Sequence, residues 1–188
     1  EIMPSLVGSE MCIRDRNPEV EEFFHKIKFP FTIGYGMTEC GPIICSSRWD
    51  TLKLASCGKA TTRMEVRIDS PDPKTHAGEI VCRGANMMLG YYKNPEATAE
   101  VIDKDNFLHS GDLGIKDEDG NYRITGRIKD MIIRGGENIY PREIEEFLYK
   151  LDGVKDVQVA GIPSKKYGEA VGAFIILQEG VEMHESDV

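Results

Sequence analysis

The stretch Gly34-Tyr35-Gly36-Met37-Thr38-Glu39 carries the most information in this sequence. It follows an apolar run, residues 29–33, which we expect to form a short buried strand that ends at the glycine-flanked turn. Glycines let the backbone approach a ligand closely, and a threonine hydroxyl can donate to a phosphate oxygen. The Glu39 carboxylate is the kind of hard oxygen ligand that Mg²⁺ prefers. The pattern indicates a phosphate site, and its alternative is a plain turn at the end of a strand.

Two later segments have the same character. His109-Ser110-Gly111-Asp112-Leu113-Gly114 precedes an expected hairpin, and Gly126-Arg127-Ile128-Lys129-Asp130 follows it. Together with residues 34–39, they resemble in order and spacing the nucleotide-binding motifs of the AMP-forming adenylate-forming enzymes. That superfamily includes the acyl-CoA synthetases, the adenylation domains of nonribosomal peptide synthetases, and firefly luciferase. The resemblance runs from about Asn17 to the C-terminus and includes residues 78–80, 90–95 and 135–141.

The gross composition is that of an ordinary globular protein. The chain has 188 residues, of which 40% are hydrophobic and 29% are charged, enough for a core of one or two domains. Its net charge of −9 argues against a nucleic-acid partner, which needs a basic surface. No apolar run approaches the length of a membrane span. The five cysteines lack metal-like spacing, so we expect reduced thiols and a cytoplasmic location, with peripheral membrane association left open for the full-length enzyme.

Residues 1–16 differ from the rest of the chain. They do not resemble the family, and the resemblance begins abruptly at Asn17. Their sequence is similar to a translated sequencing-adapter read, and it lacks the flanks of a signal peptide. We therefore treat them as an artefact outside the fold and expect no regular structure in them.

Residues 17–127 predict a mixed α/β structure, which the resemblance identifies as the C-terminal part of the large AMP-binding domain. Apolar spacing predicts a helix at 18–28, whereas residues 40–60 look irregular. Successive short strands with turns suggest a β-barrel-like or sandwich subdomain. The further predicted elements are strands at 64–68 and 79–83, a helix at 94–102, and a hairpin of strands 113–116 and 121–125 around the loop 117–120.

Residues 128–188 show a different pattern, which the resemblance identifies as a truncated mobile C-terminal domain of small α+β type. A short strand is expected at 131–133. Pro141 suits the first position of a helix, which we expect to end at Gly153. The expected buried stripe of this helix is Ile144, Phe147, Leu148 and Leu151, and further strands are expected from Val157 and at 171–177.

The resemblance implies a role for each matching residue of the nucleotide site. Thr38 and Glu39 would be catalytic, with Thr38 on the α-phosphate and Glu39 holding Mg²⁺. Tyr35 would stack on the adenine. Asp112 would accept hydrogen bonds from both ribose hydroxyls, and Arg127 would reach the ribose or a phosphate; the alternatives are a turn cap and a surface ion pair. The implied nucleotide-binding set is Gly34, Tyr35, Gly36, Met37, Thr38, Asp112 and Arg127.

The resemblance also implies a second set of residues that serves the thioester-forming half of the reaction. Lys129 matches the hinge about which the small domain of the family rotates between the two half-reactions. The loop residues Gly135, Gly136 and Asn138 would line the coenzyme A channel, where glycines permit backbone contact with the ligand. The alternative for Gly135-Gly136 is a plain tight turn between strand and helix.

The implied activity is that of a carboxylic-acid:CoA ligase. In this superfamily a carboxylate attacks the α-phosphorus of ATP and yields an acyl-adenylate and pyrophosphate; a thiol, commonly coenzyme A, then releases AMP. Residues 84–94 and 135–148 resemble fatty-acyl ligases more than peptide-synthetase domains. The alternatives are an adenylation domain that loads an amino or aryl acid onto a carrier thiol, and a non-catalytic nucleotide-binding pseudoenzyme. The phosphate loop and the catalytic lysine of the family have no counterpart in the chain, so we expect this fragment to be inactive by itself.

Overall fold

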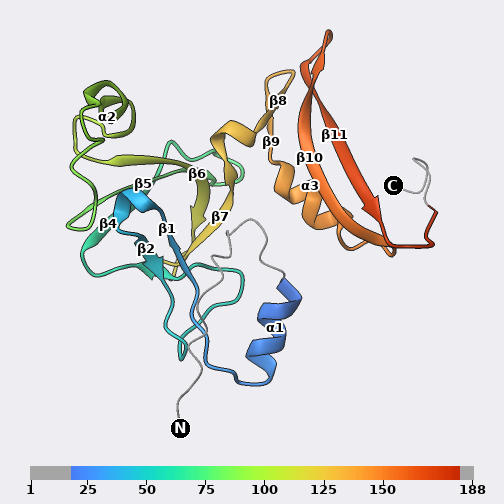
Figure 1. Cartoon of the computed structure of the whole chain (residues 1–188), viewed down its shortest axis with the longest axis horizontal. Helices are drawn as coiled ribbons and strands as arrows, with labels where there is room; N and C mark the ends of the chain where they lie inside the picture. The colour runs from blue at the N-terminus through green and yellow to red at the C-terminus, as the bar shows by residue number, and fades with distance from the viewer. Residues whose placement is uncertain (1–17, 183–188) are drawn as a thin grey trace.

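The computed structural model describes residues 18–182, which contain three antiparallel sheets and three α-helices. Figure 1 shows β1 and β2 beside the sheet of β4 to β7, and the long β10–β11 hairpin farther along, with α3 between them. The expected mixed α/β fold is confirmed. The prediction for residues 1–16 lies outside the described residues.

The first sheet, in the order β1-β2-β3, carries the glycine-flanked stretch. After helix α1 (Pro18–Lys26), pairing begins at β1 (Gly34–Gly36) and continues through β2 (Ile43–Ser46) and β3 (Lys59–Ala60). The strand expected at 29–33 is therefore wrong, because this run is irregular and Phe29 is 43% exposed. Pro30 lacks an N–H to donate, so regular pairing is delayed past it. The irregular structure expected for 40–60 is also wrong where β2 and β3 form.

The second sheet is a meander in the order β4-β5-β6-β7. Its alternating strands and the hairpin around residues 117–120 form as predicted, with Gly120 at φ +85 in the turn. Helix α2 also forms, and the Asn94 side chain caps it by accepting from the Ala97 N–H at 3.1 Å. The bounds are β4 (Met64–Asp69), β5 (Gly78–Gly84), α2 (Pro95–Val101), β6 (Leu108–Lys116) and β7 (Tyr122–Arg127).

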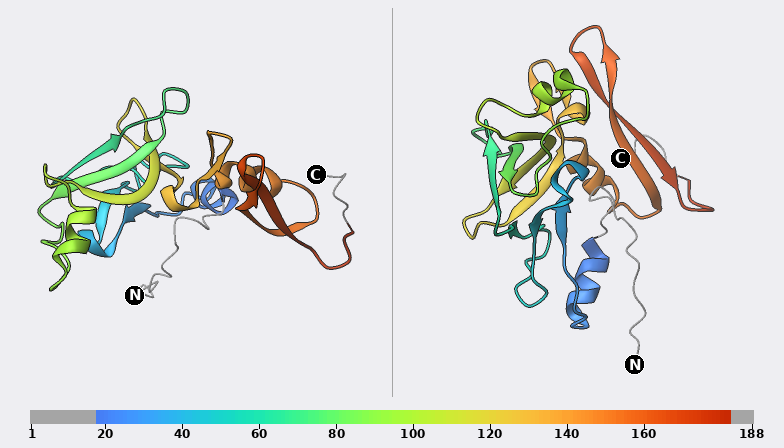
Figure 2. Two further views of the ribbon diagram at one scale, coloured as in Figure 1. Left: turned by 90° about the horizontal axis from the view of Figure 1, so that it is seen from above. Right: turned by 60° about the vertical axis from the view of Figure 1, so that its left-hand side comes forward.

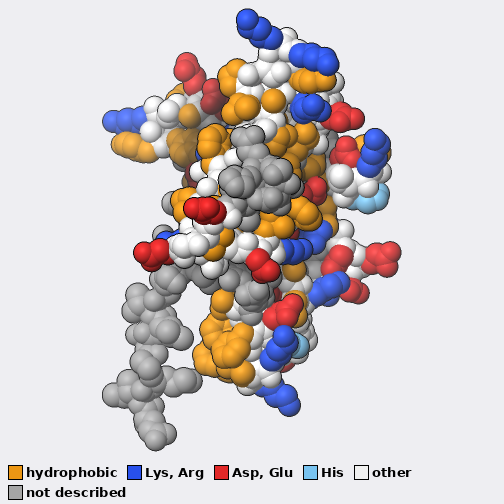
Figure 3. Space-filling view, turned by 90° about the vertical axis from the view of Figure 1, so that its right-hand side faces the viewer, with side chains coloured by type: hydrophobic (Ala, Val, Ile, Leu, Met, Phe, Trp, Pro, Cys, Tyr) orange, Lys and Arg blue, Asp and Glu red, His pale blue; other side chains and the backbone are white. Residues whose placement is uncertain are grey.

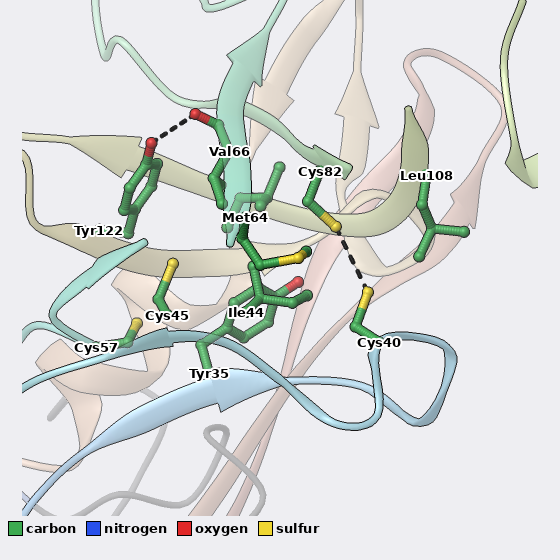
Figure 4. Close-up of a cluster of buried hydrophobic side chains, with 11 residues drawn as sticks. Tyr35, Cys40, Ile44, Cys45, Cys57, Met64, Val66, Cys82, Leu108 and Tyr122 are labelled. Atoms are coloured by element: carbon green, nitrogen blue, oxygen red, sulfur yellow. Dashed lines mark hydrogen bonds between the residues drawn. The ribbon is translucent and has the colours of Figure 1, made fainter. Parts of the chain in front are cut away.

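The first two sheets share one hydrophobic core (Figure 4). Ile44 of β2 and Ile80 of β5 are fully buried, and Tyr122 of β7 donates its hydroxyl hydrogen bond to the Val66 carbonyl at 2.7 Å. The described cysteines, Cys40, Cys45, Cys57 and Cys82, are buried free thiols in the same core. The expected subdomain of short antiparallel strands is thus present as two sheets packed over one core.

The third sheet, in the order β10-β11-β8-β9, follows the 3₁₀ turn η3 (Ile128–Asp130). Its core is formed by Ile132, Leu148, Val154, Val157 and Val159. The structure adds β9 and lengthens the two last strands into a long hairpin, neither of which the sequence pattern predicted. The bounds are β8 (Ile132–Arg134), β9 (Glu137–Ile139), α3 (Pro141–Leu148), β10 (Val154–Ser164) and β11 (Gly168–Leu177).

Helix α3 is shorter than expected. It starts at Pro141 as predicted, but it ends at Leu148 and a series of turns leads to Gly153, which has φ +89. Phe147, expected in the buried stripe, is 60% exposed, whereas Leu148 is 3% exposed. The helix packs mainly against one strand, β10. Its buried face is therefore narrow and covers Leu148 but not Phe147.

A small cluster joins the second and third sheets. Ala77, directly before β5, and Leu113 of β6 pack with Tyr140, which precedes α3. Arg142 of α3 donates to the Ile124 carbonyl of β7 at 3.4 Å. Figure 2 shows in both views that η3 and α3 lie between the meander and the β10–β11 hairpin. The domain boundary placed between residues 127 and 128 stays a prediction.

Helix α1 and strand β11 are among the elements that expose large apolar side chains. Val20 and Phe23 of α1 are 44% and 56% exposed, and Ile27, directly after the helix, is 54% exposed. Phe174 and Ile176 of β11 are 60% and 57% exposed, and Figure 3 shows hydrophobic side chains spread over the side of the molecule that carries the β10–β11 hairpin. Among the described helices, none has the length and apolar character needed to cross a membrane.

We predict that Ile44→Ala lowers the free energy of unfolding by roughly 2–5 kcal/mol, because the substitution leaves a cavity between the first two sheets. The neighbouring residue gives a matched control: Ile43 is 42% exposed while Ile44 is 0% exposed, so Ile43→Ala should cost less than about 1 kcal/mol. Chemical denaturation measures both values, and equal costs would contradict the shared core.

Candidate functional site

A pocket of about 660 Å³ opens where the first sheet meets the first half of β6 and the end of β7. It combines residues from all three motifs that the sequence singled out. The lining residues are Gly36, Met37, Thr38, Glu39, Ser110, Gly111, Asp112, Arg127, Ile128 and Lys129.

The chain from Gly36 to Glu39 reaches the pocket through a tight turn. The Met37 N–H donates to the Pro42 carbonyl at 2.8 Å, and the 3₁₀ turn η2 (Thr38–Cys40) follows. A Cβ at Gly36 would collide with the Pro42 carbonyl, so a side chain at this position is excluded. We expected Gly36 to allow the close approach of a ligand. In the structure, a glycine is required here because the backbone at Gly36 lies against the backbone at Pro42.

Glu39 is anchored from both its backbone and its side chain. The Met88 N–H donates to the Glu39 carbonyl at 2.7 Å, and the Tyr91 hydroxyl donates to Glu39 Oε1 at 2.9 Å. The hydrogen bond to Glu39 raises the pKa of Tyr91, which keeps the phenol protonated as a donor. Thr38 is exposed beside it at the pocket. The carboxylate is thus held in place while Oε2 has no hydrogen-bond partner among the described residues.

Asp112 is presented by an irregularity in β6 that we call the Asp112 bulge, residues 110–112. Val81 of β5 pairs with His109 and Glu79 pairs with Leu113, so the single residue Ile80 faces the whole bulge. Gly111 has φ +72, a backbone conformation that other residues rarely adopt. Bulges of this kind turn side chains out of the regular alternation of a strand and are frequent beside active sites.

The Asp112 carboxylate is oriented by a donor on each oxygen. The Tyr35 hydroxyl donates to Oδ2 at 2.8 Å, and Arg127 Nε donates to Oδ1 at 3.2 Å. An ionised carboxylate offers about four acceptor positions, so roughly half of its capacity is left for another ligand. The side chain of Asp112 is 17% exposed, and this residual exposure faces the pocket that it lines. The arrangement fits a vicinal diol, which would supply one donor to each oxygen.

Tyr35 lies differently from the stacking role that the resemblance implies. It is 2% exposed, belongs to the shared core and does not line the pocket (Figure 4). Burial and the nearby Asp112 carboxylate raise the pKa of Tyr35, so the phenol stays neutral and donates. In this geometry the hydroxyl serves Asp112 and the ring packs in the core. The stacking role stays a prediction.

Two cations also line the pocket. Arg127, at the end of β7, and Lys129, in η3, line it together. The side chain of Arg127 is 44% exposed, so the ion pair with Asp112 leaves part of the guanidinium open to solvent. Two cations beside an open pocket favour an anionic ligand such as a phosphate.

The residues implied for the coenzyme A channel are not part of this pocket. Gly135 and Gly136 form the tight turn between β8 and β9, with φ values of +61 and +91, and Asn138 lies in β9. Two consecutive positive φ values are typical of the turns that close two-residue hairpins. The turn at Gly135 and Gly136 thus joins two strands. The alternative interpretation of the sequence had expected a tight turn between a strand and a helix.

Sequence reasoning missed four residues around the site. Tyr91 holds Glu39, Ser110 lines the pocket, and Glu79 and His109 form an ion pair, Oε2 to Nδ1 at 2.7 Å, beside the Asp112 bulge. Glu79 and Tyr91 lie inside segments already noted for their resemblance to the family, but no local pattern assigns them a contact. The pairings depend on strand register, which the sequence alone does not fix.

A magnesium ion would have to be shared with a ligand. Within residues 18–182, no group of three or more His, Cys, Asp or Glu side chains is placed to hold a metal. Glu39 nevertheless fits Mg²⁺, which commonly takes one or two protein carboxylates and completes its shell with phosphates and water. Its anchored carboxylate lines the same pocket as Thr38, Arg127 and Lys129.

Comparisons of sequence and of structure find similar proteins among the AMP-binding enzymes. Residues 8–92, a range that includes part of segment 1–16, match the AMP-binding enzyme family, and residues 143–188 match the AMP-binding enzyme C-terminal domain. The chain is 48% identical over 157 residues to the putative acyl-CoA synthetase YngI of Bacillus subtilis (strain 168), which covers 79% of this chain and 29% of that protein. It is 38% identical over 172 residues to a long-chain-fatty-acid–CoA ligase of the same organism, covering 90% of this chain and 30% of that protein.

The fold has a counterpart in a nucleotide-bound enzyme. The crystal structure of ATP-bound MatB from Rhodopseudomonas palustris matches with a TM-score of 0.77 and 34% identity, over 83% of this chain and 32% of that one. The chain thus spans less than a third of the length of these relatives.

We predict that Gly36→Ala lowers the free energy of unfolding by roughly 1–3 kcal/mol, because the new methyl group must displace the turn at Pro42. Gly126 in β7 provides the control, since a Cβ there meets nothing within 4 Å; Gly126→Ala should stay within about 0.5 kcal/mol of the unsubstituted protein. Thermal or chemical unfolding measures both, and a neutral Gly36→Ala would contradict the close approach of the two backbones.

Proposed function

Because the chain belongs to the family of AMP-binding enzymes, we propose that it forms part of an ATP-dependent carboxylic-acid:CoA ligase. The observation that carries the proposal is the single pocket that unites Thr38 and Glu39 with Asp112 and Arg127. These residues come from separate motifs, and their chemistry suits a nucleotide: carboxylate for ribose, hydroxyl and cation for phosphate.

In this proposal the nucleotide binds with its ribose at Asp112. The two carboxylate oxygens, oriented by Tyr35 and Arg127, accept from the 2′- and 3′-hydroxyls. The Thr38 hydroxyl donates to the α-phosphate, and Arg127 stabilises the negative charge that accumulates there when the substrate carboxylate attacks. Each contact is made by this chain's own residues.

Glu39 is proposed to hold Mg²⁺ against the phosphates. When bound, the metal would neutralise phosphate charge and so favour attack by an anionic carboxylate. The hydrogen bond from Tyr91 keeps Glu39 Oε1 occupied, which leaves Oε2 as the oxygen for the metal.

The second half-reaction is proposed to use the residues beyond β7. Lys129 would act as the hinge, supported by its place in η3 between the second and third sheets. Rotation there would bring the turn at Gly135 and Gly136, with Asn138, towards the acyl-adenylate, where coenzyme A attacks. The exposed position of that turn is consistent with such a movement.

The acid is proposed to be a fatty or related carboxylic acid. The similarity to a long-chain-fatty-acid–CoA ligase and to an acyl-CoA synthetase supports this choice. A cytoplasmic location is proposed on the chemistry of the cysteines, which are free thiols in the described residues. Burial raises the pKa of Cys45 to about 12, so this thiol stays protonated within the core.

We propose the complete reaction for a polypeptide as long as these relatives, of which this chain forms one part. The chain covers 29% of one relative and 30% of the other. We expect the 188-residue chain alone to lack adenylating activity.

Pyrophosphate release tests the proposal. The complete polypeptide that contains this chain is incubated with ATP, Mg²⁺ and a panel of fatty, aromatic and amino acids, and coenzyme A is then added. We expect release with fatty acids followed by coenzyme A-dependent AMP formation, and no release by the 188-residue chain. Release with amino acids alone would move the protein to the carrier-loading enzymes, and no release with any acid would favour a non-catalytic nucleotide-binding protein.

We predict that Asp112→Ala weakens AMP binding at least about tenfold in the complete polypeptide, because two charge-assisted hydrogen bonds to ribose are lost. The matched control is Asp119→Ala in the same hairpin, since the Asp119 side chain is 73% exposed and its ion pair is with Lys53, outside the pocket. Isothermal titration calorimetry measures both, and an unchanged dissociation constant for Asp112→Ala would remove Asp112 from the nucleotide site.

A further inference from the structure

The Asp112 bulge is held from the neighbouring strand by one carboxylate. Glu79 of β5 accepts the Gly111 N–H at Oε1, over 2.9 Å, and its Oε2 lies 2.7 Å from His109 Nδ1. The side chain of Glu79 is 17% exposed, so both interactions are largely shielded from water. Two further hydrogen bonds complete the bulge: the Ser110 hydroxyl donates to the Ile80 carbonyl at 2.6 Å and accepts from the Asp112 N–H at 3.1 Å.

The extra residues of a bulge lose their partners in the strand ladder, so their polar groups must be satisfied in another way. At Gly111 the partner is Glu79, and Gly111 is the residue whose φ of +72 turns the chain before Asp112. A Cβ at Gly111 would meet nothing within 4 Å, so packing does not fix this turn. The direction in which Asp112 points therefore depends on hydrogen bonds, and a carboxylate supplies the strongest of them.

His109 in turn holds Glu79. Its other ring nitrogen, Nε2, lies 3.6 Å from Oδ2 of Asp103, in the segment between α2 and β6. Glu79 and Asp103 are the charged groups that face His109, and the hydrogen bond to Glu79 is the main cause that raises the pKa of His109 above its ordinary value of 6.5. A protonated imidazole donates its Nδ1 proton to Glu79 and forms an ion pair with Asp103, so it links the two carboxylates electrostatically.

We propose that Glu79 and His109 are positioning residues, whose ion pair fixes the Asp112 bulge so that the Asp112 carboxylate meets the nucleotide ribose. The inference rests on the proposed function, because it requires a ribose at Asp112. Neither side chain lines the pocket; both act through the backbone of Gly111. A brace that merely stabilised the sheet would not distinguish between nucleotides that have ribose hydroxyls and nucleotides that lack them.

The experiment compares two ligands, AMP and 2′,3′-dideoxy-AMP, by calorimetry on the complete polypeptide. The dissociation constant of 2′,3′-dideoxy-AMP divided by that of AMP, which we call the ligand ratio, isolates the contribution of the ribose hydroxyls. We expect Glu79→Gln, which keeps the size of the side chain, to lower this ratio roughly three- to tenfold, mainly by weakening AMP. Binding of the dideoxy nucleotide should change little.

Glu65→Gln is the matched control. Glu65 lies on β4 of the same sheet and is also paired with cations, Arg67 and Arg83, but it has no hydrogen bond to the Asp112 bulge. The substitution Glu65→Gln removes an ion-paired carboxylate from the same sheet but leaves the Asp112 bulge intact. The ligand ratio should therefore equal that of the unsubstituted protein.

A pH series on the unsubstituted protein tests the same inference without any substitution. Since the pKa of His109 is raised in the folded protein, its contribution is complete below the ordinary value of 6.5 and is lost as pH rises through the raised value. The ligand ratio should therefore fall as the pH rises above 6.5 and through the raised pKa of His109. The phosphate of both ligands titrates alike and cancels in the ratio. In His109→Gln the ratio should be low and independent of pH.

The outcomes separate the inference from the proposed function. If the unsubstituted protein binds AMP and dideoxy-AMP equally well, or binds neither, the ribose site at Asp112 fails and this inference fails with it. If AMP is preferred but Glu79→Gln and His109→Gln keep the full ratio, or the ratio is flat with pH in the unsubstituted protein, the positioning role is overturned while the proposed function stands.

Discussion

The hydrogen bond from the Tyr35 hydroxyl to Asp112 joins two sheets as well as two side chains. Tyr35 belongs to β1 in the first sheet, and Asp112 belongs to β6 in the second. The glycine-flanked turn that follows Tyr35 and the carboxylate of Asp112 are therefore set relative to each other by one buried donor. Because the ring of Tyr35 is 2% exposed, the bond is protected from competition with water. The pocket exists where this link brings the two sheets together.

Around that link the site is organised by charge. Glu39 and Asp112 present carboxylates, each already held by a phenol: Tyr91 holds Glu39 and Tyr35 holds Asp112. A phenol satisfies part of a carboxylate without neutralising it, so the charge stays available for a metal or a diol. Arg127, which is paired with Asp112, and Lys129 line the same pocket as cations. This combination of acidic and basic groups suits a nucleotide, because its ribose hydroxyls need acceptors and its phosphates need cations.

Connections between the meander and the third sheet are few. Within residues 18–182 they include the small cluster around Leu113 and Tyr140, the bond from Arg142 to the Ile124 carbonyl, and η3. Parts joined by limited contacts and a short connecting turn can change their relative position at low cost. The same turn carries Lys129, which lines the pocket, so a movement there would displace one of the cations of the pocket.

The sequence by itself determined the elements that local chemistry controls. Alternating residues placed β4 and β5, an Asp-Gly turn placed the β6–β7 hairpin, and Pro141 started α3. The order and spacing of the motifs were enough to identify the family, and the family implied the mixed α/β fold. The same reasoning failed at residues 29–33, where apolar composition suggested a strand but Pro30 and the geometry of pairing delayed it to Gly34.

Only the tertiary structure decided how the site is assembled. Motifs give residue types, whereas contacts depend on which strands pair and in which register. The Asp112 bulge arises from a register shift between β5 and β6, and it is this shift that brings Glu79 to Gly111 and turns Asp112 into the pocket. The burial of Tyr35 likewise follows from packing against residues that are distant in sequence, such as Leu108 and Tyr122. Such non-local choices are fixed by the total packing and hydrogen bonding of the fold, which no short stretch of sequence contains.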